Sequence, residues 1–137
     1  MSETNRLKFL KIALVLVGVI FSAGLFTLMI AWPSLWPSGW AWHAGHSHYP
    51  MMIVGVYATL GVFLLIAARN PLEHLSIIRF TIWSSVVHAA IMTVQSFMGE
   101  GNYGHLVGDV PALFLVAAVL AVLTPRDGKG RSLQGAV

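Results

Sequence analysis

The sequence predicts an all-α membrane protein, a four-helix up-down bundle that crosses the bilayer four times and keeps both termini in the cytoplasm. Composition is the first support, because 57 % of the 137 residues are hydrophobic and only 9 % are charged. A soluble domain has about a quarter of its residues charged. The mean hydropathy of +0.77 also indicates a membrane protein. The positions of the Lys and Arg residues predict which ends of the helices face the cytoplasm. The length allows one membrane domain over residues 1–137.

Four apolar stretches are long enough, or nearly so, to cross the hydrocarbon core, which takes about 20 helical residues. They cover residues 9–32, 51–68, 75–98 and 106–124. The first stretch is longer than the apolar part of a cleaved signal peptide and no Ala-x-Ala site follows it, so we expect it to be retained. A Trp- and His-rich outer loop, 33–50, follows the first stretch, and a polar tail, 126–137, that we expect to be mobile follows the fourth.

Local signals suggest where the helices begin and which faces they pack. Asn70 can cap the third helix and Pro71 suits its first position, while Asp109 is the expected cap of the fourth. Small residues spaced by four predict helix contact faces. These pairs are Gly18 with Ser22, Gly55 with Thr59, and Ala117 with Ala121.

All eight cations fall on one side of this topology. They are Arg6, Lys8, Lys11, Arg69, Arg79, Arg126, Lys129 and Arg131. The two outer connections, 33–50 and 99–105, contain none of them. The positive-inside rule therefore places both termini in the cytoplasm. Because topology explains where the cations lie, the high isoelectric point is not a signal for nucleic-acid binding.

The third stretch carries a polar stripe. At about 100° per residue, six polar side chains and one Met fall within an arc of about 120°. They are Thr81, Ser84, Ser85, His88, Met92, Gln95 and Ser96. Such a stripe is costly against lipid, so we expect it to face the inside of a bundle or an oligomer interface. The simplest interpretation of the stripe is hydrogen bonding between helices.

His88 lies near the middle of its apolar stretch, and an ionisable residue at that depth suggests function. With Ser84, Ser85 and Gln95 it forms a candidate cofactor-binding set. His88 could relay a proton, ligate haem or chlorophyll, or hydrogen-bond a quinone. Haem is disfavoured because no second His lies at this depth on another span. The structural alternative is a neutral His88 bonded to a nearby Ser or to Tyr57.

The outer connections contain most of the remaining histidines. His43, His46 and His48 lie within six residues of one another, and the second connection adds His105 and, just beyond it, Asp109. Imidazole suits zinc and copper, so these five residues form a candidate metal site. Flexible His-rich loops also bind metals adventitiously. The same histidines could instead sense pH, because the ordinary pKa of His is near 6.5.

Four stretches of the sequence support a family resemblance. They are residues 45–49 (GHSHY), 52–71 (MIVGVYATLGVFLLIAARNP), 83–88 (WSSVVH) and 104–111 (GHLVGDVP). Together they resemble a family of small bacterial four-span membrane proteins of unknown function. The resemblance covers most of the chain and implies a multi-pass protein of the bacterial inner membrane, with no implied activity, ligand or partner.

Three classes of function stay open. The sequence favours a non-enzymatic accessory or assembly protein, as a homo-oligomer or within a larger membrane complex. The second class is a periplasm-facing copper or zinc protein, or a haem- or quinone-associated redox protein. The third is a small proton-coupled transporter subunit that uses His88. A standalone enzyme has the least support, because the sequence has no cysteine, no evident nucleophile–base pair and no paired carboxylates.

Overall fold

The computed structural model describes residues 2–32, 34, 49–98 and 102–125. Within these ranges the chain is all helical and contains no strand, as the sequence predicts. Its elements are α1 (Glu3–Val19), η1 (Ile20–Gly24), η2 (Thr27–Ala31), α3 (Tyr49–Ala67), α4 (Leu75–Ser96), η4 (Asn102–Leu106) and α5 (Asp109–Leu123). The segments η1 and η2 are π-helical and continue α1, and η4 is a 3₁₀ turn. The histidines of the outer loop and the polar tail lie outside the described residues.

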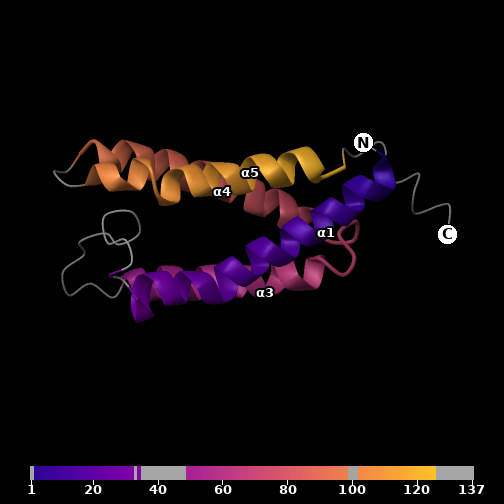
Figure 1. Ribbon diagram of the computed structural model, residues 1–137, viewed down its shortest axis with the longest axis horizontal. Helices are drawn as coiled ribbons and strands as arrows, with labels where there is room; N and C mark the ends of the chain where they lie inside the picture. The colour runs from indigo at the N-terminus through magenta and orange to yellow at the C-terminus, as the bar shows by residue number, and fades with distance from the viewer. Residues whose placement is uncertain (1, 33, 35–48, 99–101, 126–137) are drawn as a thin grey trace.

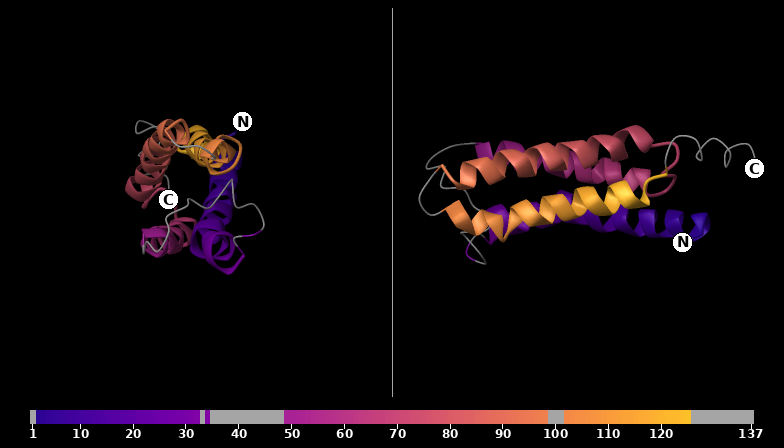
Figure 2. Two further views of the ribbon diagram at one scale, coloured as in Figure 1. Left: turned by 90° about the vertical axis from the view of Figure 1, so that its left-hand side faces the viewer. Right: turned by 90° about the horizontal axis from the view of Figure 1, so that it is seen from above.

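The four α-helices run side by side in an up-down arrangement around a common axis (Figures 1 and 2). One end of the bundle holds the start of α1, the turn between α3 and α4, and the end of α5; we call it the termini end. The opposite end, where α3 and η4 begin, is called the loop end. Helix α4 packs against α5, and α1 packs against both α3 and α5.

Three helical segments are long and apolar enough to cross a membrane: Glu3–Met29, Leu75–Ser96 and Tyr103–Leu123. The helix at Met51–Ala67 is apolar but shorter. Large apolar side chains are exposed on the outside of the bundle, among them Val56, Trp83 and Val122, each 68 % exposed. Lipid solvates such surfaces at far lower free energy than water does. Three of these helices could therefore cross a membrane.

The helix starts differ in part from the sequence prediction. Helix α1 begins well before its apolar stretch, because Ser2 caps it by accepting the amide of Asn5 at 3.3 Å. Helix α4 begins at Leu75 rather than at Pro71. The intervening residues form two tight turns, in which the amides of Glu73 and His74 donate to the carbonyls three residues back, each at 3.2 Å. The predicted cap at Asn70 is therefore wrong.

Helix α5 begins with Asp109 as its first residue, and Gly108 occupies the cap position. Asp109 therefore does not serve as the cap that the sequence suggests. Its carboxylate accepts from a histidine instead, as described below.

The crossing of α1 and α3 depends on two glycines. A Cβ atom placed on Gly61 would lie 2.5 Å from the amide nitrogen of Ser22 and 2.6 Å from the carbonyl oxygen of Gly18. The predicted contact face of α1 at Gly18 and Ser22 is thus confirmed. Its partner is Gly61, whereas a Cβ on Gly55 would meet nothing within 4 Å.

Apolar side chains fill the half of the bundle nearest the termini end. This apolar core comprises Leu10, Ala13, Leu14, Val17, Phe21, Leu64, Ala67, Ala68, Ile78 and Leu120. Four of its leucines, on α1, α3 and α5, are completely buried. Close packing of these side chains therefore leaves no open path for water through that half of the bundle.

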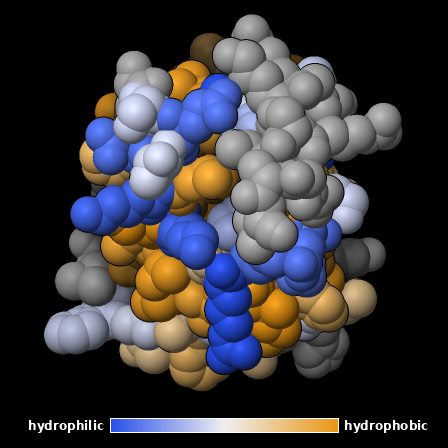
Figure 3. Space-filling model, turned by 90° about the vertical axis from the view of Figure 1, so that its right-hand side faces the viewer, coloured by the Kyte–Doolittle hydropathy of each residue, from blue (hydrophilic) through white to orange (hydrophobic). Residues whose placement is uncertain are grey.

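Hydrophilic side chains gather at the termini end, with hydrophobic side chains beside them (Figure 3). One of them, Arg6, ties the first helix to the last. Its guanidinium donates to the carbonyls of Val122 at 2.8 Å, Leu123 at 3.1 Å and Thr124 at 2.7 Å. The last carbonyls of a helix lack partners within the helix, so Arg6 caps α5 from outside.

Candidate functional site

The polar stripe of α4 points mainly into the bundle, as its pattern predicts. Thr81, Ser85, Met92 and Ser96 are buried, and Ser84 and His88 are half-buried. On the opposite face, Trp83, Val87, Val94 and Phe97 are exposed. Gln95 is the exception within the stripe, because it is exposed in the last turns of α4.

Most hydroxyl groups of this helix bond to their own backbone. Thr81 donates to the carbonyl of Ile77 at 2.9 Å and Ser96 donates to that of Met92 at 2.8 Å. Ser84 donates to the carbonyl of Thr81 at 3.2 Å. These bonds satisfy the hydroxyl groups without a partner helix. Thr81, Ser84 and Ser96 therefore do not make the interhelical bonds that the simplest interpretation of the stripe expects.

His88 makes the bond between helices. Its Nδ1 lies 3.0 Å from the hydroxyl oxygen of Tyr57 on α3, and the tautomer of the imidazole decides which group donates. The two rings meet edge to face, with centroids 5.6 Å apart. The ring of Phe21, in the π-helical segment η1, packs edge to face on Tyr57 at 4.8 Å. A wider π-helical turn thus accompanies the contact of α1 with this pair.

His105 and Asp109 form a second pair, at the start of α5. Nδ1 of His105 lies 2.9 Å and 3.1 Å from the two carboxylate oxygens of Asp109. His105 lies in η4 and Asp109 is the first residue of α5, so the turn at residues 107–108 brings the two side chains together. Only 1 % of the His105 side chain and 19 % of the Asp109 side chain are exposed. The pair is therefore held within the protein rather than on its surface.

The two pairs lie toward the same end of the bundle. The carboxyl group of Asp109 is near enough to Tyr57 and His88 to interact electrostatically with both. Tyr57, His88, His105 and Asp109 thus form what we call the polar cluster, built from α3, α4, η4 and α5. Within the described residues, Nε2 of His88 makes no hydrogen bond, so it is the atom of this histidine with bonding capacity left.

The polar cluster lies between the middle of the bundle and the loop end. Helix α4 runs from the termini end at Leu75 to Ser96, so His88 lies past its midpoint, and Asp109 begins α5 at the loop end. The apolar core occupies the other half. The fully buried leucines of the core therefore lie toward the termini end, and the polar cluster lies toward the loop end and borders the core at Tyr57.

The polar cluster contains residues from both of the candidate sites that the sequence predicts. His88, from the candidate cofactor set, joins His105 and Asp109, from the candidate metal set. Ser84 bonds to its own helix and Gln95 is exposed, so neither belongs to the cluster. His43, His46 and His48 lie outside the described residues, and the described part of the chain contains no group of three His, Asp or Glu placed to hold a metal ion.

The electrostatic link between Asp109 and His88 is the feature that sequence reasoning missed. The only available signal is that both residues lie in the outer half of their predicted spans. Which helices are neighbours, and how each is rotated, decides whether they meet.

Comparison with known proteins gives one match. Residues 4–135 match the model of a family described as "Family of unknown function (DUF6632)". No curated protein and no solved structure matches the chain.

Proposed function

This chain belongs to the family of unknown function DUF6632, and from its own residues we propose that it is a four-span membrane protein that acts as a non-enzymatic accessory or assembly protein. We further propose that both termini are cytoplasmic, in the inner membrane of a bacterium. Its partners in this proposal are lipid and other membrane subunits or copies of itself.

Two features support four spans. Helix α3 has 19 residues, which at about 1.5 Å per residue gives roughly 28 Å, close to the thickness of the hydrocarbon core. It also lies alongside three helices that are long enough to cross (Figure 1). All described cations lie at the termini end or in the helical turns next to it: Arg6, Lys8, Lys11, Arg69 and Arg79. That distribution supports a cytoplasmic termini end.

The packed apolar core is the observation that carries the proposed function. Beneath the polar cluster, the packed side chains of the apolar core fill the bundle down to the termini end. A proton or solute that crossed the bundle would have to displace side chains such as Leu14, Leu64 and Leu120, all 0 % exposed. Such a route is costly, so an accessory protein is favoured over a proton-coupled transporter that uses His88.

A metal-handling protein is the second candidate, and the His105–Asp109 pair favours it. Histidines that ligate a metal commonly place a carboxylate on their other ring nitrogen, which fixes the tautomer. In this hypothesis His105 is one ligand, and His43, His46 and His48 supply others from the outer side. Copper or zinc would suit such a set.

One purification tests these alternatives. The protein is extracted in mild detergent, and its absorption spectrum, bound metals and oligomeric mass are measured, together with those of His105→Gln and of the control His74→Gln. We expect a colourless, metal-free protein in a stable assembly. Stoichiometric copper or zinc that His105→Gln removes and His74→Gln retains would establish the metal hypothesis, and a Soret band would establish haem.

Flux and topology complete the test. In proteoliposomes, we expect wild type and His88→Leu to conduct protons no faster than empty vesicles. Flux that depends on His88 would overturn the accessory function. A reporter fused after Val137 should be active only in its cytoplasmic form, and activity in its periplasmic form would overturn the proposed orientation.

A further inference from the structure

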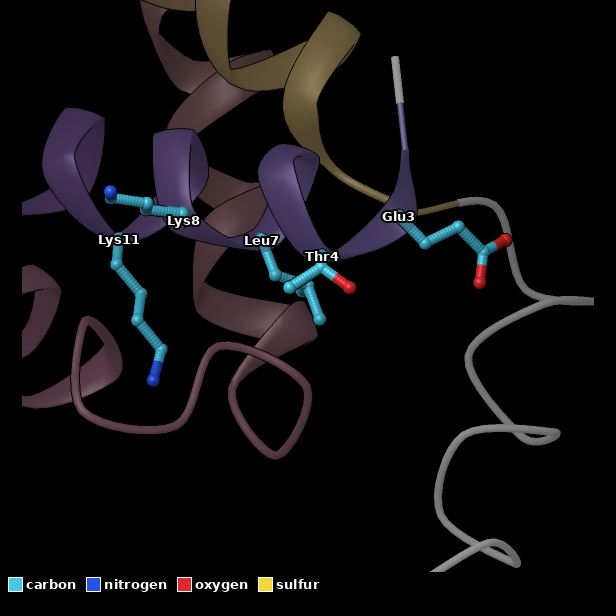
Figure 4. Close-up of a pocket in the computed structure, with 5 residues that line it drawn as sticks. All are labelled: Glu3, Thr4, Leu7, Lys8 and Lys11. Carbon is cyan, nitrogen blue, oxygen red and sulfur yellow. The ribbon is translucent and has the colours of Figure 1, made fainter.

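A cavity of about 500 Å³ runs along one flank of α1 at the termini end. It is lined by Glu3, Thr4, Leu7, Lys8 and Lys11 (Figure 4). The lining covers more than two turns of helix, so it is a feature of the side chains rather than of the free amides of the first turn. It lies at the opposite end of the bundle from the polar cluster.

The lining combines two cations, a hydroxyl and an apolar side chain. Lys8 and Lys11 are exposed and make no ion pair within the described residues. Arg6, by contrast, is occupied by the carbonyls of α5. Glu3, the one carboxylate, lies at the far end of the lining from Lys11 (Figure 4). An anion placed beside the lysines would meet little repulsion there.

The position of the cavity relative to the membrane indicates which kind of anion it binds. Lys11 lies inside the apolar stretch that begins at residue 9, and its neighbours Phe9 and Ile12 are 48 % and 46 % exposed. These side chains face lipid if α1 spans the membrane, so the ammonium of Lys11 must extend toward the headgroup level. Lys8 and Lys11 are three residues apart and share a face, and both side chains can turn toward one ligand.

We propose that this cavity binds the phosphate-bearing headgroup of an anionic phospholipid in the leaflet at the termini end. The phosphate oxygens accept from the ammonium groups of Lys8 and Lys11 and from the Thr4 hydroxyl. Leu7 contacts the glycerol and the start of the acyl chains. The site rests on the proposed function only in requiring that α1 lies in a membrane.

The test uses the full chain in nanodiscs of phosphatidylcholine with or without phosphatidylglycerol. After release from the nanodisc, native mass spectrometry counts the lipids that stay bound. We expect wild type to retain phosphatidylglycerol in preference to phosphatidylcholine. Lys8→Gln and Lys11→Gln should each lower that retention about fivefold, which corresponds to roughly 1 kcal/mol per basic residue near a membrane surface.

Three comparisons sharpen the test. Arg69→Gln removes one exposed cation from the same end of the bundle and should leave retention unchanged, and Lys11→Arg should preserve it. Equal losses in Arg69→Gln and Lys11→Gln, or no preference for phosphatidylglycerol in wild type, would overturn the proposal. A third outcome, in which inorganic phosphate alone displaces the lipid, would show that the site binds a soluble anion instead.

The result is separable from the proposed topology. Both leaflets of a nanodisc have the same composition, so lipid retention does not depend on which end of the bundle faces the cytoplasm. The reporter after Val137 tests orientation independently.

Discussion

His88 shows how an ionisable side chain can be placed inside an apolar bundle. Its Nδ1 is bonded to Tyr57, and the carboxyl group of Asp109 lies within electrostatic range. Asp109 is itself held by His105. A lone charged group near the centre of a helix in lipid costs about 2.5–3.5 kcal/mol. Shared hydrogen bonds reduce that cost by giving each polar group a partner inside the protein.

At this scale we predict the effect of Tyr57→Phe. Loss of the hydroxyl leaves Nδ1 of His88 without its partner, while the contact of the ring with Phe21 remains. The free energy of unfolding should fall by about 0.5–1.5 kcal/mol, the range for hydrogen bonds between helices in membranes. Unfolding by SDS in mixed micelles, followed by circular dichroism, measures it.

The matched control is Tyr103→Phe. Tyr103 is 58 % exposed and contacts Phe97 through its ring, with centroids 6.2 Å apart. We expect a change within about 0.5 kcal/mol, as for other exposed substitutions. If both variants lose the same stability, the bond between Tyr57 and His88 contributes nothing specific.

At the scale of the elements, small residues allow α1 and α3 to pack closely against each other. Their backbones meet at Gly18, Ser22 and Gly61, where no side chain fits between them. Close approach at small residues is the usual way in which helices associate in lipid. It also brings Phe21 onto Tyr57, so the crossing helps to position one member of the polar cluster.

We predict that Gly61→Ala forces these helices apart. Its Cβ would lie 2.5 Å from the amide nitrogen of Ser22, which is backbone and cannot rotate away. The free energy of unfolding should fall by about 1–3 kcal/mol, as in other overpacked interiors. The same SDS titration reports the loss.

Gly55→Ala is the matched control on the same helix, because its Cβ would meet no atom within 4 Å. Alanine favours helix over glycine by up to about 1 kcal/mol, so this variant should be neutral or more stable. A Gly61→Ala protein as stable as Gly55→Ala would contradict the close crossing.

At the scale of the whole molecule, the bundle is held together differently at its two ends. The bond between Tyr57 and His88 joins α3 to α4 toward the loop end, and the apolar core joins all four helices toward the termini end. Beyond the core, Arg6 fixes the start of α1 to the end of α5. The sequence predicts Arg6 only as a signal for orientation.

We predict that Arg6→Gln loosens the termini end without changing the fold. Three charge-assisted bonds to the end of α5 are lost, and because they are partly exposed we expect the total loss to be about 1–3 kcal/mol. Hydrogen exchange measured by mass spectrometry should rise over the last turn of α5. Lys8→Gln removes a cation two residues away and should leave that exchange unchanged.

Much of this fold follows from composition and periodicity. The apolar stretches predict the helices, and the 3.6-residue period of α4 predicts that His88 points inward. The site follows only in part, because the pairing of His88 with Asp109 depends on which helices are neighbours. The π-helical segments of α1 and the turn before α4 could not be anticipated. The segment η1 lies where the chain packs against Gly61 of α3, and the turn is held by its own hydrogen bonds.

The link between Arg6 and α5 also has a consequence for biosynthesis. A ribosome makes Arg6 before the other helices, whereas the carbonyls of Val122, Leu123 and Thr124 that accept from it emerge after them. In the proposed topology, the guanidinium stays at the membrane surface, solvated by water or lipid headgroups, until α5 is inserted. Its bonds to the end of α5 can form only after all the helices have been made. A chain that stops before α5 would lack these bonds between the first and the last helix.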